Sequence, residues 1–275
     1  MGPVPVGQES GSGQVPAHGG PVAVSVRGLS HAFEDPEGNA APVLVDIDLE
    51  ITTGEFVAIV GPSGCGKTTL MNLIAGLEAS QTGQVEVAGH RPRAGDRQVG
   101  YLFARDALLP WRTVLGNAEL AMEIGGVDKS ERRERAMSML GDVGLSHAVH
   151  SYPAQLSQGM RQRVAIARTL ATTPDLLMLD EPFSALDAQT KLLLQDTFSQ
   201  LWAQLSATVV LITHDLSEAI ALADRVVLMT ARPGRIKRVF PVDLPRPRSI
   251  MNLQGEAAYH KIYEQLWGEL REEVS

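Results

Sequence analysis

The sequence predicts an α/β protein with a mostly parallel sheet whose two faces are covered by helices. Short aliphatic runs alternate with helical patterns through much of the chain, as in parallel strands joined by helices. One such run, residues 56–60, leads through a glycine-rich segment into a helical pattern at residues 70–77. Another run, residues 176–179, ends in Asp180 and Glu181. Each of these observations favours the same fold class.

Length and composition set the broad class of protein. A chain of 275 residues, 44% of them hydrophobic, can form one large domain or a domain with a subdomain. No apolar run approaches the ~18 residues of a membrane-spanning helix, and the N-terminus lacks a basic start followed by an apolar stretch. We therefore expect a soluble, cytosolic protein. The net charge of −8 argues against nucleic acid as the main partner.

The N-terminal part predicts a leader followed by short strands. Residues 1–20 are rich in Gly, Pro, Ser and Gln, which predicts a disordered leader. A strand is expected at residues 22–26 and a turn-rich segment at residues 34–42. Residues 43–51 alternate between apolar and acidic side chains, as in an edge or antiparallel strand. Further short strands are expected at residues 56–60, 83–88 and 99–103.

The middle of the chain changes to helical patterns. Helices are expected at residues 114–123, 129–143 and 157–171, with Gly125, Gly126 and Gly144 at the breaks between them. This block predicts an α-helical subdomain inserted at residues 104–170. Strands and helices alternate again after the insert, with strands at 176–181, 208–213 and 225–230 and helices at 188–206 and 216–223.

The C-terminal part predicts a basic, proline-bearing stretch beyond Arg232 and a final helix. Apolar side chains recur along that helix at helical spacing: Tyr259, Ile262, Tyr263, Leu266, Trp267 and Leu270. The opposite face carries Glu264, Glu269 and Glu272. We expect this stripe to dock on the protein's own domain and not on a membrane surface.

The segment GPSGCGKTT, from Gly61 to Thr69, predicts phosphate binding because it lies between a strand and a helix. Glycines let the backbone turn N–H groups toward phosphate oxygens, and the helix N-terminus adds partial positive charge. Lys67 is expected to meet the β- and γ-phosphates, and the Thr68 hydroxyl to ligate Mg²⁺. The simpler alternative is a glycine turn that leads into a helix. The full set of expected ATP contacts in this segment is Gly61, Pro62, Ser63, Gly64, Cys65, Gly66, Lys67, Thr68 and Thr69.

Cys65 is the single cysteine of the chain and cannot form an internal disulfide, which agrees with a reducing compartment. Two interpretations of its thiol are open. It is either a small side chain at a variable loop position or a redox switch, since a helix N-terminus lowers the pKa of a thiol.

Two strand ends carry candidate catalytic groups. Asp180 and Glu181 emerge at the carboxyl edge of the sheet, where ligands of open parallel sheets bind. Asp180 is expected to hold Mg²⁺ through water, and Glu181 to orient and polarise the water that attacks the γ-phosphate. His214 ends the next apolar strand and is expected to donate to the γ-phosphate. Taken alone, each of these could be an ordinary polar residue at a strand end.

A second anion-binding helix start lies in the helical insert. The stretch LSQGMRQRVAIARTL, residues 156–170, opens a helix with Ser157 and Gly159 near its N-terminus. One chain therefore has two phosphate-binding ends but only one nucleotide-binding lobe. A head-to-tail dimer resolves this, because Ser157 and Gly159 of one subunit would cap the γ-phosphate that the other subunit holds.

These motifs together resemble the ATP-binding cassette (ABC) family over about residues 22–240. The matching pieces are GPSGCGKTT, LSQGMRQR, LLMLDEP, the D-loop Ser184-Ala185-Leu186-Asp187 and the ITHD segment with His214. The resemblance implies a P-loop NTPase (RecA-like) fold with a mostly parallel sheet, an antiparallel β edge and the inserted helical subdomain. It also implies that Phe33 stacks on adenine, although a lone aromatic is more often part of the core.

The resemblance divides the chain into five parts and supplies cofactors and partners. Residues 21–103 and 171–240 would form the nucleotide-binding lobe, 104–170 the helical subdomain, 1–20 the leader and 241–275 a C-terminal extension. ATP and Mg²⁺ are the implied cofactors. The implied partners are a second copy of the chain, two integral-membrane permease subunits and, indirectly, a substrate-binding protein, with the ATPase at the cytoplasmic face of the membrane.

The sequence departs from the family pattern at two positions. Gln158 stands where glycine is commonest in the signature, but Ser157 and Gly159 remain. In YLFARDALLPW, Ala104 replaces a glutamine that usually meets Mg²⁺ and the attacking water and senses the membrane partner. An alanine can neither ligate nor hydrogen-bond through its side chain, so this link is missing or is supplied by another group.

Two segments, residues 106–120 and the basic stretch after Arg232, resemble the nitrate, sulfonate, taurine and bicarbonate importer ATPases. Trp111 either lines a groove for a membrane subunit or packs inside the helical subdomain. We expect an importer ATPase. The alternatives are a non-transport cassette ATPase, whose repair and chromosome types need a longer insert than residues 69–156 allow, and a small-molecule kinase, in which the signature helix would have no purpose. The sequence does not identify the transported molecule, because selectivity resides in a membrane subunit and a binding protein.

Overall fold

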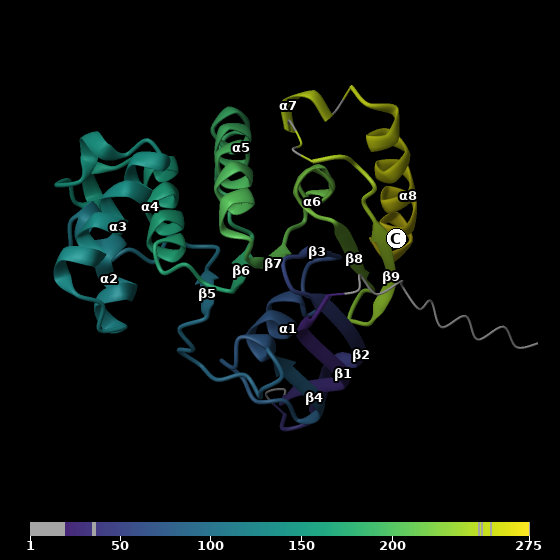
Figure 1. Cartoon of the computed structure of the whole chain (residues 1–275). Coiled ribbons are helices and arrows are strands. Elements are labelled where there is room, and N and C mark those ends of the chain that lie inside the picture. Colours follow the sequence, from purple (N-terminus) through teal and green to yellow (C-terminus); the bar gives the residue numbers. More distant parts are fainter. Residues whose placement is uncertain (1–19, 35–36, 247, 249, 254, 275) are drawn as a thin grey trace, which may run out of the picture.

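The computed structural model describes residues 20–34, 37–246, 248, 250–253 and 255–274 (Figure 1). The leader expected at residues 1–20 lies outside the described residues except for Gly20. Within the described parts of the chain, no helix is long and apolar enough to cross a membrane.

The central element is a six-stranded sheet. Five of its strands pair in parallel, and the sixth, β9, joins the edge antiparallel to β8. The spatial order is β5 (Val99–Leu102), β6 (Leu176–Asp180), β7 (Thr208–Ile212), β3 (Phe56–Val60), β8 (Arg225–Met229) and β9 (Ile236–Pro241). This confirms the predicted α/β fold with a mostly parallel sheet and an antiparallel edge.

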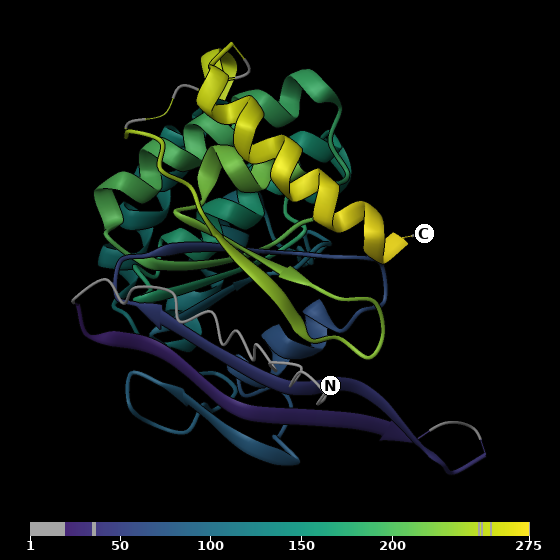
Figure 2. The same ribbon diagram turned by 90° about the vertical axis from the view of Figure 1, so that its right-hand side faces the viewer.

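A separate antiparallel sheet covers one side of the molecule (Figure 2). It is formed by β1 (Val22–Glu34), β2 (Ala40–Thr52) and β4 (Thr82–Val87), in the order β2-β1-β4. The sequence predicted a short strand at 22–26 and a turn-rich segment at 34–42, but the hairpin strands are longer. Register shifts between Val26 and Leu29 interrupt the alternation that marks a strand, which hid its second half.

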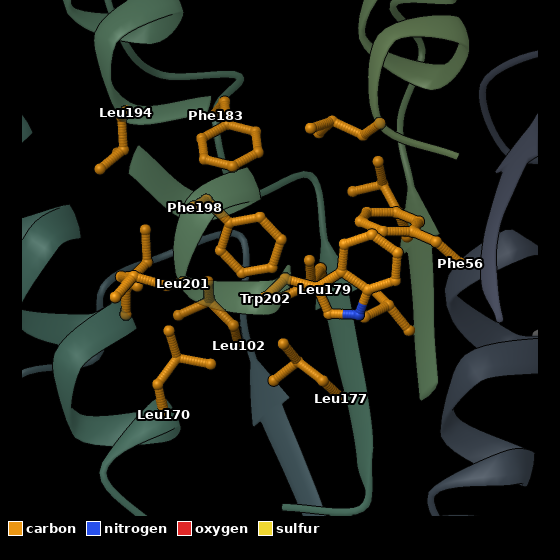
Figure 3. Packing of buried hydrophobic residues seen from close by; sticks show 14 of the residues in the cluster. Phe56, Leu102, Leu170, Leu177, Leu179, Phe183, Leu194, Phe198, Leu201 and Trp202 are labelled. Carbon is orange, nitrogen blue, oxygen red and sulfur yellow. The ribbon is translucent and has the colours of Figure 1, made fainter. Parts of the chain in front are cut away.

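Alternate residues of the central strands face two different hydrophobic cores. Phe56 and Ala58 of β3 contribute to the core on one side, and Val57 and Ile59 contribute to the core on the other side. Helix α1 (Lys67–Ile74) fills the space toward the antiparallel sheet. Helices α5 (Ala188–Leu205) and α6 (Leu216–Leu222) cover the opposite face. Figure 3 shows the aromatic centre of the core under α5 and α6, where Phe56 meets Phe198 and Trp202 edge to face.

Three further helices gather beyond β5, at the left of Figure 1. They are α2 (Val114–Ile124), α3 (Lys129–Asp142) and α4 (Gln158–Leu170), with short 3₁₀ turns at Ser146–Ala148 and Pro153–Gln155. A side chain caps each helix start: Thr113 accepts from the Gly116 N–H, Asp128 from Ser130 and Ser157 from Met160. These caps explain why the helices begin where the sequence pattern placed them.

The C-terminal part differs from the prediction in two respects. The basic stretch contains strand β9, which was not predicted, and the chain then forms α7 (Ile250–Leu253) and α8 (Ala257–Val274). In α8 the predicted stripe docks through Tyr259 and Leu266, but the side chain of Trp267 is half exposed. Glu269 and Glu272 form ion pairs with Lys237 of β9 and do not occupy a purely solvated face.

Candidate active site

The glycine-rich segment forms a tight loop between β3 and α1. Gly64 and Gly66 have positive φ angles of 76° and 100°, a region that favours glycine. A Cβ atom on Gly66 would lie 2.8 Å from Leu44 Cδ2 and 2.9 Å from Val43 Cγ1 of the neighbouring β2. Helix α1 therefore begins in close contact with the antiparallel sheet, and its first N–H groups point into the loop.

Lys67 is held inside this loop. Its ammonium group donates to the carbonyl oxygens of Gly61 and Pro62 at 2.8 and 2.9 Å, and the side chain is buried. Cys65 is fully buried beside it, with its Sγ 3.8 Å from Lys67 Nζ. Burial raises the pKa of the Cys65 thiol by more than the Lys67 charge lowers it. These observations favour the first interpretation of Cys65, a small packed side chain.

Thr68 and Asp180 meet across the sheet edge. The Thr68 hydroxyl donates to Asp180 Oδ1 at 3.4 Å, and Asp180 ends β6. Burial raises the pKa of Asp180, and the neighbouring charge of Glu181 adds to this, while the Thr68 hydrogen bond and Lys67 oppose it. Within the described parts of the chain, no group of three or more His, Cys, Asp or Glu side chains could hold a metal ion.

Glu181 and His214 follow adjacent strands, β6 and β7, and lie together as predicted. His214 Nδ1 is 3.5 Å from Glu181 Oε1. The Glu181 N–H donates to Ile212 O at 2.9 Å, and Glu181 has a positive φ of 47°, which is uncommon for a residue with a side chain. This bend turns the chain away from the strand direction just after Asp180.

An open cleft of about 420 Å³ joins these groups. Its lining contains most of the predicted loop residues together with Glu181 and Phe33, and its members are Phe33, Val43, Ser63, Gly64, Gly66, Lys67, Thr68, Thr69, Glu181 and Arg232. Phe33 is 43% exposed and forms a T-shaped contact with His31, at 4.8 Å between ring centroids. Its ring is therefore not part of the core.

Two larger hollows lie at the opposite edge of the sheet. Their volumes are about 460 and 760 Å³, and their linings include Gly54, Thr208 and Arg225, at the starts of parallel strands. Ligands of open parallel sheets bind beyond the carboxyl ends of the strands. The smaller cleft is therefore the better candidate for the active site.

Arg232 is a cleft residue that sequence reasoning missed. It lies in the loop between β8 and β9, and its side chain reaches the cleft because β9 turns the chain back along the sheet edge. From the sequence, this part of the chain was predicted only to be a basic, proline-bearing stretch. No local pattern there could place Arg232 beside Phe33 and Lys67, because the contact depends on tertiary folding.

The structure does not bring the second anion-binding helix start into the cleft. Ser157 is the N-cap of α4, and its Oγ accepts from the Met160 N–H at 3.3 Å. A Cβ atom on Gly159 would lie 2.9 Å from Thr190 Cγ2, so glycine is needed there for close packing against α5. Neither residue lines the cleft of its own chain.

The segment that contains Ala104 is fastened to α4. Asp106 forms an ion pair with Arg161 at 3.0 Å, and Arg168 donates to the carbonyl oxygens of Asp106 and Ala107 at 2.8 Å each. No described side chain takes the place of the glutamine in the cleft lining.

Further along the chain, the buried Asn117 side chain donates to the carbonyl oxygens of Leu109, Arg112 and Thr113.

Among the described residues of this helical unit, Trp111 and Ile124 are the two most exposed large apolar side chains. Trp111 is 71% exposed and Ile124 is 77% exposed. Trp111 is therefore not packed inside the helical unit, which removes one of the two interpretations given above. An exposed tryptophan on a turn that a buried asparagine holds in place is typical of a contact surface.

Comparisons with known proteins agree with this geometry. A family model described as ABC transporter matches residues 44–184. The uncharacterised ABC transporter ATP-binding protein MJ0412 of Methanocaldococcus jannaschii is 45% identical over 233 residues, which cover 85% of this chain and 87% of that protein. The taurine import ATP-binding protein TauB of Escherichia coli O157:H7 is 45% identical over 218 residues, which cover 79% of this chain and 85% of that protein. The solved dimeric structure of a post-hydrolysis state of the ATP-binding cassette MJ0796, bound to ADP and Pi, has a TM-score of 0.72 and 31% identity, and covers 81% of this chain and all of that one.

Proposed function

Because this chain belongs to the ABC transporter family, whose ATP-binding subunits hydrolyse ATP, we propose that it is the ATPase subunit of an importer. Two copies would bind ATP between them, and binding and hydrolysis would drive a pair of membrane permease subunits. The observation that carries the proposal is the cleft itself. Lys67, Thr68 and Glu181 line it together, and Asp180 and His214 contact two of them.

The loop residues would bind the triphosphate. The backbone N–H groups of residues 63–69 would donate to phosphate oxygens, and Lys67 would exchange its carbonyl partners for the β- and γ-phosphates. Phe33 would stack on the adenine ring with its exposed face. Pro62, Ser63 and Thr69 complete the loop and shape its rim.

Thr68 and Asp180 would hold Mg²⁺. Mg²⁺ in nucleotide sites usually keeps several waters and takes one or two protein oxygens together with phosphate oxygens. A hydroxyl and a carboxylate 3.4 Å apart at the mouth of the phosphate loop fit this donor set. Bound by Thr68 and Asp180, Mg²⁺ would supply positive charge that offsets the charge developing on the phosphate oxygens.

Glu181 and His214 would act on the attacking water. Glu181 would orient the water and accept a proton from it, while His214 would donate to the γ-phosphate from the neighbouring strand. Catalysis would come from positioning and charge stabilisation, with no covalent intermediate. The contact between Glu181 Oε1 and His214 Nδ1, at 3.5 Å, supports this role.

A second copy of the chain would complete the site. Ser157 and Gly159 of the opposite subunit would cap the γ-phosphate, and the dimeric structure of the similar cassette MJ0796 supports such an assembly. In this scheme residues 104–170 would be the helical subdomain that meets the permease, with Trp111 at the contact. Residues 21–103 and 171–240 would form the nucleotide-binding lobe, and residues 241–275 the C-terminal extension.

The transported molecule would be a small anion such as nitrate, an aliphatic sulfonate or taurine. The similarity to a taurine import protein supports this class. The chain would work at the cytoplasmic face of the membrane, and a substrate-binding protein would reach it only through the permease. Uptake assays on a deletion strain, with each anion in turn, would identify the substrate.

The substitution Glu181→Gln tests the catalytic assignment. We expect ATP turnover to fall by about 10²–10⁴-fold, the usual contribution of a positioned general base, while ATP binding persists. Steady-state phosphate release and equilibrium ATP binding measure the two quantities. Glu86→Gln, on an exposed position of β4, is the matched control and should keep wild-type turnover. Retained hydrolysis in Glu181→Gln would remove Glu181 from this role.

Copurification tests the transport assignment separately. The wild-type chain should copurify with an integral membrane protein when it is expressed with its neighbouring genes. Recovery with ribosomes or DNA and not with a membrane protein would favour a non-transport cassette ATPase.

A further inference from the structure

The loop between β8 and β9, residues 230–235, lies against the phosphate loop. The Gly234 N–H donates to Val43 O at 2.8 Å, and the Val45 N–H donates to Gly234 O at 3.0 Å. A Cβ atom on Gly234 would lie only 2.1 Å from Cys65 O. The backbone of the β8–β9 loop is thus wedged between β2 and the phosphate loop, and a side chain at position 234 would separate them.

The far side of this loop is held by the last turn of α8. The Ala231 N–H donates to Glu273 Oε2 at 3.0 Å, and Glu273 also pairs with Lys237 of β9 at 2.9 Å. Within the loop, the Arg235 N–H donates to Thr230 Oγ1 at 2.9 Å. The residue next to Ala231 in the chain is Arg232. The contacts with β2 and the phosphate loop on one side, and with α8 on the other, therefore fix the backbone position of Arg232.

Arg232 places a second cation in the lining of the cleft. Its Nε donates to Pro42 O of β2 at 3.4 Å, and Arg232 lines the cleft together with Val43 and Phe33. Among the described residues, no acidic side chain forms an ion pair with Arg232. A guanidinium group has five N–H donors in a planar fork that matches phosphate oxygens, so this group retains donors for a ligand.

We propose that Arg232 is a nucleotide-binding residue that holds the α- and β-phosphates of the bound nucleotide. The inference rests on the proposed function of the cleft. Arg232 contacts Pro42, which pairs with Ala32, the residue before Phe33. In the proposed binding mode Phe33 marks the adenine end, and Lys67 and Glu181 mark the γ-phosphate end. Arg232 therefore contributes to nucleotide affinity and takes no part in the chemical step.

The test compares Arg232→Gln with Arg235→Gln as the matched control. Arg235 belongs to the same loop and is exposed, and it does not line the cleft. For Arg232→Gln we expect the Kd for ATP and the Kd for ADP to rise together by about tenfold, as for loss of one charge-assisted contact. The kcat at saturating ATP should stay within about twofold of wild type. Arg232→Lys, which keeps the charge but loses the fork, should lie between Arg232→Gln and wild type.

Isothermal titration with ATP and with ADP, combined with steady-state kinetics, distinguishes the outcomes. If wild type binds ATP and Arg232→Gln binds ATP and ADP equally well, the inference is wrong and the proposed function stands. A fall in kcat with unchanged affinity also overturns it. If wild type itself fails to bind ATP, the proposed function is wrong. Thermal midpoints show whether a variant is folded. If Arg232→Gln does not fold, the affinities of Arg232→Lys are compared with wild type in its place.

A second pair of variants tests whether α8 positions Arg232. Glu273→Ala removes the acceptor of the Ala231 N–H, whereas Glu272→Ala removes only one carboxylate from Lys237. We expect Glu273→Ala to raise the Kd for ATP in the same direction as Arg232→Gln and by a smaller factor, about twofold to fivefold. Glu272→Ala should bind ATP as wild type does. Equal affinities for Glu273→Ala and wild type would show that α8 does not support Arg232.

Discussion

Among single residues, Glu218 of α6 is in an unusual environment. It is almost fully buried and pairs with Lys191 at 2.9 Å, and Gln195 donates to its Oε2 at 3.2 Å. Its Oε1 has no hydrogen-bond partner among the described residues. Burial raises the pKa of Glu218 to about 7, even though Lys191 opposes the shift. Lys191 also pairs with Asp215, the residue after His214, so this buried cluster adjoins the candidate active site.

The raised pKa of Glu218 predicts that stability falls as pH rises from about 4.5 to about 7. In that window the folded protein keeps a proton on Glu218 that the unfolded chain releases, so the free energy of unfolding decreases with pH. The shift from the ordinary pKa of 4.5 corresponds to about 3 kcal/mol at most. Glu218→Gln has no such proton to lose and should show a shallower decline.

Urea unfolding at about pH 5 and about pH 8 measures this difference. Between the two pH values, wild type should lose about 2–3 kcal/mol more than Glu218→Gln. Glu264→Gln, at an exposed position of α8, is the control and should follow wild type. Parallel pH profiles for wild type and Glu218→Gln would contradict the assignment.

Sequence reasoning at this scale succeeded where local order determines position. Glu181 and His214 each follow a buried parallel strand, and parallel strands end at one edge, so their proximity could be predicted. Arg232 and the Lys191–Glu218 pair could not be predicted. Their positions depend on how a loop returns beside β2 and how two helices pack, which residue spacing does not encode.

Among the elements, α5 carries much of the core on one face of the main sheet. Phe198 is 1% exposed and meets both Phe56 and Phe183 edge to face, at centroid distances of 6.4 and 6.1 Å (Figure 3). Trp202, one turn later, contacts Phe56 and donates its indole N–H to Ala207 O. This helix therefore fixes the sheet strands that position Glu181 and His214.

Phe198→Ala should lower the free energy of unfolding by about 3–5 kcal/mol, because it removes a buried ring and leaves a cavity among side chains that cannot fully collapse. Leu193→Ala, on the same helix but 51% exposed, is the control and should cost under about 1 kcal/mol. Chemical denaturation of both variants gives the comparison. Equal losses would mean that the aromatic cluster does not limit stability.

The strand segments that the sequence did not predict lack the regular alternation that marks a strand. Strand β9 is rich in Lys and Arg, and it is stabilised by ion pairs with α8, so neither alternation nor hydrophobicity marks it. The second half of β1 follows a register shift near Gly28, which breaks the period of two. The long helices were predicted well because their caps and apolar faces are local signals.

For the whole molecule, the main feature is that the two predicted phosphate-binding ends are separate. The phosphate loop lies against β2 of the antiparallel sheet. Ser157, in contrast, is the N-cap of α4 in the helical unit and does not line the cleft. A single chain therefore presents two complementary halves of a nucleotide site. In the proposed function, association of two copies would join them.

Ser157→Arg should prevent that association. In the Glu181→Gln background, ATP should convert the protein to a dimer, and the added Ser157→Arg change should keep it monomeric, because a bulky cation at the N-terminus of α4 opposes the helix dipole and fills the interface. Light scattering after size exclusion reports the mass. Ser130→Arg, near the start of α3 at an exposed position, is the control and should still dimerise. A dimer that survives Ser157→Arg would rule out this interface.

The attachment of the loop at residues 104–107 to α4 has a mechanical consequence. Arg161 and Arg168 are two turns apart on α4, and both hold the same short segment, through the Asp106 carboxylate and the carbonyl oxygens of Asp106 and Ala107. A displacement of this loop would therefore be passed to α4, the helix that Ser157 caps. This connection uses no side chain at position 104.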